Sequence, residues 1–136
     1  MKKKKVLFIC IYNSARSQMA EGLLRALCGD RYEVYSAGIF SSGVNPDCFK
    51  TMKEIQIDIS GQRSKSITEL QCHEFDYVVT LCSEAEDSCP VFPTRHKKIH
   101  WNLEDPVKAQ GSEEERLAVF RKVRGQIQQN IETIFK

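Results

Sequence analysis

The chain has 136 residues, and its 20 lysines and arginines nearly balance 18 aspartates and glutamates, for a net charge of +2. That length suits a single domain over residues 1–136, and the small net charge gives no reason to expect nucleic acid as a partner. No apolar stretch is long enough to span a bilayer, and the basic run at residues 2–5 leads into an apolar segment without a signal-peptide cleavage site. We therefore expect a cytoplasmic protein with no membrane contact.

The predicted elements of the first half alternate between strands and helices. Residues 6–10 form a continuous apolar run that is typical of a strand covered on both faces. Apolar side chains then recur at helical spacing over residues 20–27, and residues 32–37 indicate a second strand. Asn45 and Pro46 predict the start of another helix, because asparagine caps helix N-termini and proline suits the first helical position.

The second half continues the alternation. Residues 66–69 match a capping box for a short helix, and residues 77–81 and 98–101 indicate two further strands. Apolar residues spaced along 120–134 mark a long closing helix. The alternation predicts an α/β fold of three layers, with a four-stranded parallel sheet flanked by helices on both faces.

Polar and reactive residues follow three of the predicted strands. Cys10, Cys82 and the segment 102–106 each lie just beyond a strand end. Ligands of parallel sheets bind beyond the carboxyl ends of the strands, so these residues could share one site. The six cysteines of a cytoplasmic chain are expected to be thiols, some of them reactive, rather than a structural disulfide framework.

The loop that follows Cys10 has the features of an anion site. Its amide N–H groups can point inward, the next helix adds positive potential at its N-terminus, and Arg16 supplies a planar fork for a tetrahedral oxyanion. The loop lacks glycine, so Asn13 is the residue best able to adopt a positive φ. This setting favours the Cys10 thiolate, to which Ser14 and Ser17 could donate hydrogen bonds.

The loop consists of Cys10, Ile11, Tyr12, Asn13, Ser14, Ala15, Arg16 and Ser17. Its sequence resembles that of the low-molecular-weight protein tyrosine phosphatases and of the arsenate reductases that share their fold, and the resemblance extends along nearly the whole chain. It implies that a thiolate attacks the central atom of phosphate or arsenate while the loop holds the anion.

An oxygen leaving group needs a proton donor, and a carboxylate pair follows the fourth predicted strand. The resemblance puts Asp105, which precedes Pro106, at the general-acid position. Glu104 is the competing candidate, because the sequence does not show which carboxylate faces inward. The phosphatases carry this acid later in the chain beside two tyrosines, and the C-terminal helix here has no tyrosine. This argues against a phosphotyrosine enzyme.

Two more cysteines favour redox chemistry. Reduction of arsenate to arsenite needs two electrons and hence a dithiol, whereas thiols do not reduce phosphate. Cys82 and Cys89 are seven residues apart, and a helix between them would separate their Cα atoms by about 10 Å. A disulfide tolerates only about 4.4 to 6.8 Å, so joining them requires the segment to unwind. The pair resembles the second and third cysteines of the thioredoxin-coupled arsenate reductases.

The resemblance implies a relay of three thiols. Cys10 attacks arsenic while Arg16 and the loop amides hold the anion, and Asp105 protonates the departing hydroxide. Cys82 then attacks Cys10 and releases arsenite, and Cys89 attacks Cys82 to free Cys10. Arsenate is the implied substrate and thioredoxin the implied partner. We expect no cofactor, no bound metal and a monomer.

Position 65 departs from the family pattern. Thioredoxin-coupled relatives hold a potassium ion beside Asn13, with residues that match Glu21, Ser36 and an aspartate at position 65, which is Lys65 here. Our hypothesis is that the Lys65 ammonium replaces the cation and makes activity insensitive to potassium. The alternative is a solvated loop lysine.

Two loop positions also depart from the pattern. Ala15 stands where the family often has cysteine, and we expect reduction to survive because the relay needs only three thiols. Ile11 stands where a small residue or threonine is common, so one hydrogen bond near the anion is expected to be missing.

Two other functions stay open. A phosphatase with incidental thiols would hydrolyse phosphate monoesters, and a weak activity of this kind could accompany arsenate reduction. Alternatively Cys82, Cys89, His96 and His100 have the side chains of a zinc site, although they lack the close cysteine pair of common structural sites. Three further cysteines have no assigned role: Cys28, Cys48 and Cys72.

Overall fold

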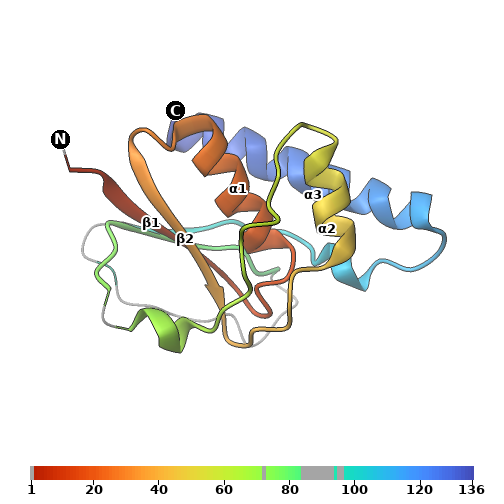
Figure 1. The fold of residues 1–136 in the computed structure, drawn as a ribbon, viewed down its shortest axis with the longest axis horizontal. Coiled ribbons are helices and arrows are strands. Elements are labelled where there is room, and N and C mark those ends of the chain that lie inside the picture. The colour runs from red at the N-terminus through yellow and green to blue at the C-terminus, as the bar shows by residue number, and fades with distance from the viewer. Residues whose placement is uncertain (1, 72, 84–93, 95–96) are drawn as a thin grey trace.

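The computed structural model describes residues 2–71, 73–83, 94 and 97–136. The residues outside this description include Cys72, Cys89 and His96. They also include residues 84–88 of the segment between Cys82 and Cys89, which was proposed to be helical. The described elements, in chain order, are β1 (Lys4–Cys10), α1 (Arg16–Cys28), β2 (Tyr32–Gly38), α2 (Pro46–Lys53), the 3-10 helix η1 (Ile67–Leu70), β3 (Tyr77–Thr80), β4 (Lys97–His100), the 3-10 helix η2 (Pro106–Lys108) and α3 (Glu113–Ile134) (Figure 1).

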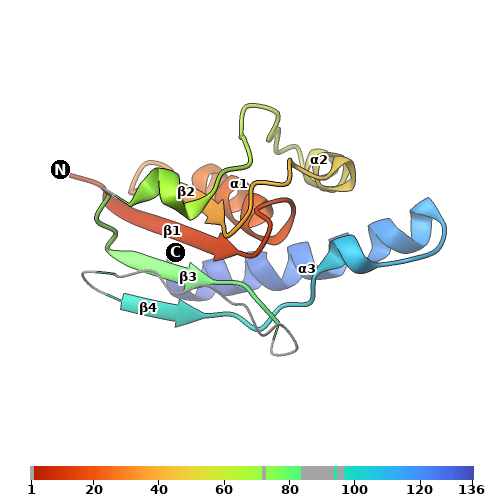
Figure 2. The ribbon, with the colours of Figure 1, turned by 90° about the horizontal axis from the view of Figure 1, so that it is seen from below.

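The four strands form one parallel sheet in the order β2-β1-β3-β4, which confirms the predicted sheet (Figure 2). Cys10 at the end of β1 stands opposite Gly38 at the end of β2. On the other side Ile9 stands opposite Thr80, and the Ile9 carbonyl accepts a hydrogen bond from the Leu81 amide at 2.9 Å. The strand ends that carry the candidate site residues therefore meet at one edge of the sheet.

Alternate residues of β1 enter two different cores. Val6 and Phe8 lie on the face that α1 and α3 cover, where the side chains pack into one large apolar cluster. Leu7 and Ile9 pack in a smaller cluster with Leu70 of η1. The ribbon of η1, at residues 67–70, lies on the side of the sheet away from α1 and α3 (Figure 1). The alternation follows from strand geometry, because successive side chains point to opposite sides of a sheet. The predicted α/β class is confirmed, and the short element at residues 66–69 forms as a 3-10 helix.

The closing helix follows the predicted pattern until its last turn. Ser112 and Glu115 form a capping box at its start, and the buried apolar positions are Leu117, Phe120, Val123, Ile127 and Ile131. Ile134 was expected on the same face, yet it is 39% exposed, and Phe135 is buried instead. The helix ends at Ile134, and the following residue turns back against Phe8 and Tyr32.

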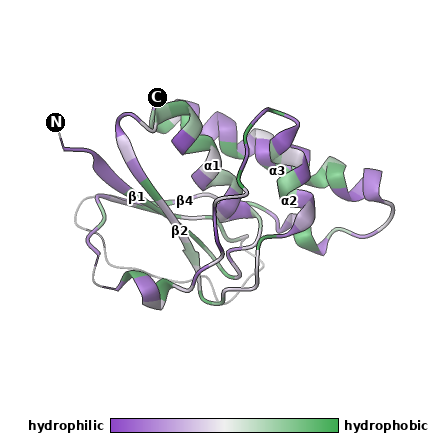
Figure 3. Cartoon of the chain, viewed as in Figure 1, coloured by the Kyte–Doolittle hydropathy of each residue, from purple (hydrophilic) through white to green (hydrophobic). Residues whose placement is uncertain are grey.

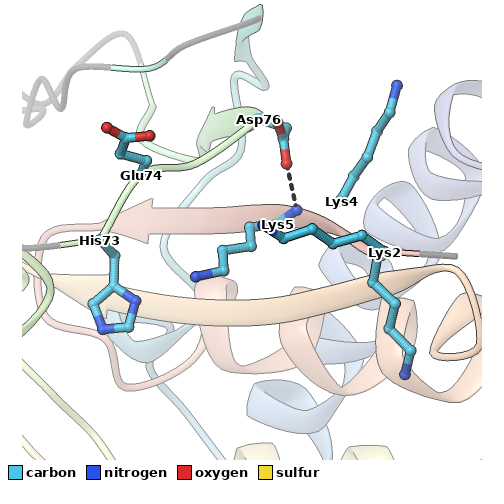
Figure 4. A pocket seen from close by; sticks show the side chains of 7 residues that line it. Lys2, Lys4, Lys5, His73, Glu74 and Asp76 are labelled. Atoms are coloured by element: carbon cyan, nitrogen blue, oxygen red, sulfur yellow. Dashed lines mark hydrogen bonds between the residues drawn. The ribbon is translucent and has the colours of Figure 1, made fainter.

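The amino edge of the sheet is hydrophilic, as the colouring of the N-terminal segment shows (Figure 3). A hollow of about 590 Å³ lies there, lined by Lys2, Lys3, Lys4, Lys5, His73, Glu74 and Asp76 (Figure 4). The Asp76 carboxylate accepts a hydrogen bond from the Lys5 amide at 2.8 Å, and Lys2 to Lys4 are exposed. This hollow is at the end of β1 opposite Cys10. No helix in the described part of the chain is long and apolar enough to cross a membrane.

Candidate active site

The loop between β1 and α1 has its carbonyl groups turned outward. Five successive carbonyls accept hydrogen bonds from groups outside residues 10–16: Ile11 from the Phe40 amide, Tyr12 from the Ser42 amide, Asn13 from the Gln18 side chain, Ser14 from the Asn45 amide and Ala15 from the Met19 amide. In a trans peptide the N–H points away from the C=O. The amides of residues 12–16 are therefore left facing the interior of the loop, as an anion site requires.

Asn13 has the predicted left-handed conformation, with φ of 49°. Its buried side chain donates to the hydroxyl oxygens of Ser17 at 2.7 Å and Ser36 at 3.0 Å. Its own carboxamide oxygen accepts from the Gln18 side chain at 2.9 Å and from the Lys65 amide at 2.8 Å. Bonds on every side of the carboxamide hold Asn13 in a backbone region that other L-residues rarely adopt.

The Cys10 sulfur is the centre of the loop. Cys10 is a free thiol, 2% exposed, with its sulfur 2.8 Å from the Ser17 hydroxyl oxygen and accepting from the Asn13 amide at 3.2 Å. Hydrogen bonds of this kind favour a negatively charged sulfur. Ser17 and Cys10 close the loop from its two ends. Ser14 makes no such contact in the described part of the chain, and its carbonyl is used to anchor the loop to Asn45 instead.

Asp105, and not Glu104, faces this loop. The Arg16 guanidinium is buried, donates to the Leu103 carbonyl at 3.0 Å and lies 3.7 Å from the Asp105 carboxylate. The Asp105 side chain is 8% exposed and caps η2 by accepting from the Val107 amide. The Glu104 side chain is 50% exposed and pairs with Lys122 at 2.8 Å. Of the two carboxylates, Asp105 is therefore the one that faces the loop, and its role as general acid stays a prediction.

Cys82 follows β3 at the same edge of the sheet as Cys10. It is fully buried and disulfide-bonded, and its partner lies outside the described residues. The hydrogen bond from the Leu81 amide to the Ile9 carbonyl keeps the chain leaving β3 beside the chain leaving β1. The fold thus brings Cys10 and Cys82 to neighbouring strand ends, with Cys10 reduced. Two members of the zinc alternative, Cys89 and His96, lie outside the described residues.

Glu21, Ser36 and Lys65 meet behind Asn13. The Ser36 hydroxyl donates a short hydrogen bond to the Glu21 carboxylate, and the Lys65 ammonium lies 3.8 Å from that carboxylate. The same ammonium donates to the Arg63 carbonyl at 3.1 Å. The Lys65 side chain is only 12% exposed, and burial lowers its pKa. The side chain of Lys65 is therefore not solvated, as the alternative interpretation of this residue had it.

A family model for low molecular weight phosphotyrosine protein phosphatases matches residues 5–136. The chain belongs to this family. A protein named arsenate reductase from Halalkalibacterium halodurans is 50% identical over 133 residues, which cover 98% of this chain and 96% of the relative. A protein of the same name from Bacillus subtilis is 49% identical over 127 residues, covering 93% of this chain and 91% of the relative.

Solved structures of this phosphatase family agree with the fold. An arsenate reductase in the oxidized state has a TM-score of 0.80 at 38% identity and covers 96% of this chain and 95% of its own. A thioredoxin-dependent arsenate reductase from Corynebacterium glutamicum has a TM-score of 0.68 at 29% identity, covering 97% of this chain and 62% of its own. A low molecular weight protein tyrosine phosphatase from T. tengcongensis has a TM-score of 0.77 at 25% identity, covering 97% of both chains.

Sequence reasoning missed three residues that shape the family loop in this chain. Gln18 and Gln62 are joined by hydrogen bonds, and Gln18 contacts Asn13. Gly38 lies so close to the loop that an added Cβ would be 2.7 Å from the Ile11 carbonyl oxygen and 2.8 Å from the Asn13 amide nitrogen. Gly38 ends the second predicted strand, and a glycine at such a position can indicate that another backbone passes close by, so this residue could have been found from the sequence. Gln18 and Gln62 belong to no sequence motif that would have pointed to their contacts.

The mouth of the site has an apolar rim. Tyr12 and Phe40 are 41% and 55% exposed and stack on each other, with ring centroids 5.8 Å apart. A hollow of about 430 Å³ adjoins the loop, with Tyr12, Ser14, Asp105 and Val107 among its lining residues. Asp105 therefore belongs both to the Arg16 pair and to the lining of this hollow.

Proposed function

We propose that this chain is an arsenate reductase, which reduces arsenate to arsenite through Cys10 and a disulfide relay regenerated by thioredoxin. One observation carries the proposal: the reduced Cys10 thiol, held by hydrogen-bond donors, and the disulfide-bonded Cys82 follow neighbouring strands at one edge of the sheet. A phosphatase needs one cysteine and water, so a second cysteine that forms a disulfide at the neighbouring strand end favours a reductase. The relatives named arsenate reductases support the same conclusion.

The first step forms a bond between sulfur and arsenic. Inward amides and the Arg16 guanidinium bind the oxygens of arsenate, and the Cys10 thiolate attacks the arsenic atom. The bond from arsenic to one hydroxyl breaks, and Asp105 protonates that leaving group so that it departs as water. The position of Asp105 beside Arg16 and the hollow supports this role.

The second step transfers two electrons. Cys82 attacks the Cys10 sulfur, the electron pair of the sulfur–arsenic bond stays on arsenic, and arsenite leaves. Cys89 then attacks Cys82, which releases Cys10 as a thiolate and leaves a disulfide between Cys82 and Cys89. The dithiol of thioredoxin reduces that disulfide and becomes oxidised itself. We propose that the enzyme acts as a monomer, because one chain supplies all of these residues. We propose that it works in the cytoplasm, because thioredoxin keeps thiols reduced in that compartment.

Lys65 has a supporting role in this proposal. Its ammonium takes the place of a monovalent cation near Asn13, beside one oxygen of the buried Glu21 carboxylate, while Arg25 pairs with the other oxygen at 2.6 Å. The distance of 3.8 Å between Lys65 and Glu21 and the small exposure of both side chains support this assignment. Glu21 in turn accepts from Ser36, which accepts from Asn13. The cation site and the anion loop thus share one hydrogen-bond network.

The decisive test couples arsenate to thioredoxin. Purified protein is mixed with arsenate, thioredoxin, thioredoxin reductase and NADPH, and arsenate-dependent oxidation of NADPH is followed beside hydrolysis of p-nitrophenyl phosphate. We expect multiple turnovers of arsenate reduction and at most weak hydrolysis. Strong hydrolysis without arsenate-dependent NADPH oxidation would show a phosphatase instead.

Variants of single cysteines separate the relay from incidental thiols. Cys82→Ser and Cys89→Ser are expected to stop multiple turnover, because each removes a sulfur that must accept or pass on the disulfide. Any hydrolysis of p-nitrophenyl phosphate should persist in both. Cys28→Ser makes the same change in a buried thiol at the far end of α1 and should keep turnover. Unchanged reduction in Cys82→Ser or Cys89→Ser would break the proposed relay.

A further inference from the structure

The Gln18 carboxamide is buried at the junction of three segments. It lies in the first turn of α1, is 0% exposed, and donates from its side-chain nitrogen to both oxygens of Asn13, at 3.1 Å for the main-chain carbonyl and 2.9 Å for the carboxamide. The same nitrogen is 3.2 Å from the Arg63 carbonyl, and the Gln18 side-chain oxygen accepts from Gln62 at 2.9 Å. Every polar atom of this side chain therefore has a partner.

The two bonds to Asn13 act on a residue with an unusual backbone. In the left-handed conformation of Asn13 its main-chain and side-chain oxygens both approach one point, where their partial negative charges repel each other. The Gln18 amino group supplies hydrogens to both oxygens, which stabilises that arrangement. Other donors reach the Asn13 side chain, but in the described part of the chain the Asn13 main-chain carbonyl is bonded by Gln18.

The conformation of Asn13 matters to the nucleophile. With φ of 49° the Asn13 amide points at the Cys10 sulfur, 3.2 Å away, and the Asn13 side chain donates to Ser17, whose hydroxyl contacts the same sulfur. A backbone shift at Asn13 would weaken both contacts together. Gln18 thus reaches the Cys10 sulfur through one intervening residue.

We propose that Gln18 is a positioning residue for the Cys10 nucleophile, acting by holding Asn13 in the conformation that donates to the sulfur. Gln62 supports it from the segment before Lys65, by fixing which way the Gln18 carboxamide points. The inference deepens the proposed function, because it names a residue that makes the attacking sulfur reactive. It applies to the thiol of the free enzyme and needs no bound arsenate.

The test measures the reactivity of Cys10 alone. Wild type and Gln18→Leu are treated with iodoacetamide from pH 5 to pH 10, and alkylation is quantified by mass spectrometry on the tryptic peptide of residues 6–16, whose one cysteine is Cys10. Weaker donation from the Asn13 amide to the Cys10 sulfur should slow alkylation of Gln18→Leu by about tenfold near pH 6.5. The difference between the two rates should shrink toward pH 10, above the ordinary pKa of a cysteine thiol.

Three further variants test whether slower alkylation of Cys10 comes from the lost bonds to Asn13 or from a general loss of stability. Gln18→Glu keeps the shape of the side chain but offers at most one donor, so it should also slow alkylation, and it tests the proposal if Gln18→Leu does not fold. Gln62→Leu leaves the bonds to Asn13 in place and should slow alkylation less. Thr51→Val removes a buried side-chain hydrogen bond within α2 and should leave alkylation unchanged at equal loss of thermal stability.

The outcomes separate this proposal from the proposed function. Alkylation of Gln18→Leu or Gln18→Glu at the wild-type rate near pH 6.5 would overturn the role of Gln18, and so would an equal slowing in Thr51→Val. Neither result depends on arsenate or thioredoxin. Failure of the wild type in the coupled assay would overturn the arsenate reductase proposal while leaving the alkylation result intact.

Discussion

The guanidinium of Arg16 lies 3.7 Å from the carboxylate of Asp105, and both side chains are almost completely buried. One residue begins α1 and the other precedes η2, so the pair joins the anion loop to the loop after β4. A second carboxylate stands next to Asp105 in the chain, and of the two it is Asp105 that the pair with Arg16 holds toward the loop after β1. The neighbouring Glu104 is turned toward Lys122 instead.

Asp105→Asn should slow the enzyme far more than Glu104→Gln. Asparagine keeps the shape of the side chain but cannot transfer a proton, and loss of a general acid lowers kcat by about 10² to 10⁴. Glu104→Gln removes an exposed ion pair, which contributes about 0 to 1 kcal/mol to stability, and should leave kcat unchanged. Single-turnover arsenate reduction measures both. A normal rate in Asp105→Asn would remove Asp105 from the mechanism.

Lys65→Met should create a response to potassium that the wild type lacks. Without the ammonium, the Glu21 oxygen that Lys65 faces and the Ser36 hydroxyl offer ligands to a free cation, while Arg25 keeps the other Glu21 oxygen. Potassium should therefore raise the rate of the variant above its rate in sodium. Arg63→Met is the matched control, because Arg63 is 66% exposed and pairs with Glu69 on the surface. Steady-state rates in sodium and potassium buffers decide the matter. A large potassium stimulation of the wild type would count against the hypothesis.

Gly38→Ala should disturb the anion loop from outside. The new Cβ would meet the carbonyl oxygen of Ile11 and the amide nitrogen of Asn13 at distances that real side chains do not adopt, so the loop backbone must move. A displacement of this kind costs about 10- to 100-fold in rate. Gly61→Ala adds the same methyl group where nothing lies within 4 Å and should be neutral. Equal rates for the two variants would show that the loop tolerates the methyl group.

Protonation of Glu54 should make the stability of the fold depend on pH in the acid range. Hydrogen bonds from Arg121 and then Arg124 lower the pKa of Glu54 from 4.5 to about 2. A carboxyl whose pKa is lower in the folded than in the unfolded protein stabilises the fold fully at pH values above its pKa in the unfolded chain. The contribution of Glu54 is therefore lost as pH falls from about 4.5 toward 2. The gap in Tm between wild type and Glu54→Gln should therefore shrink over that interval. A constant gap would contradict this account of the cluster.

Patterns of apolar residues were enough to predict the sheet and the main helices. The buried run of β1 and the period of α3 express burial directly, and Asn45 and Pro46 mark the start of α2 by local chemistry that needs no tertiary contact. The exception at Ile134 has a local cause. Helical spacing does not reveal the residue at which a helix stops, and Phe135 takes the buried place as soon as it does.

The part of the candidate site that depends on local backbone conformation could be predicted from the sequence. A glycine-free anion loop needs one residue with positive φ, and Asn13 was the suitable candidate. The choice between Glu104 and Asp105 was beyond the sequence, because adjacent side chains point in different directions that the packing of other segments decides. The same holds for Gln18, whose importance depends on where Arg63 and Lys65 happen to pass.

The outward carbonyls of the loop after β1 have a consequence for substitutions within it. The hydrogen bonds that fix the path of the loop are made by main-chain carbonyls to partners outside it, so they do not depend on the side chains of Ile11, Tyr12 or Ala15. Ile11 and Ala15 are nevertheless buried, and Ala15 packs into the apolar core. The room around the side chain therefore limits what can replace these two residues, whereas the exposed Tyr12 is the position of the three where replacement meets the weakest constraint.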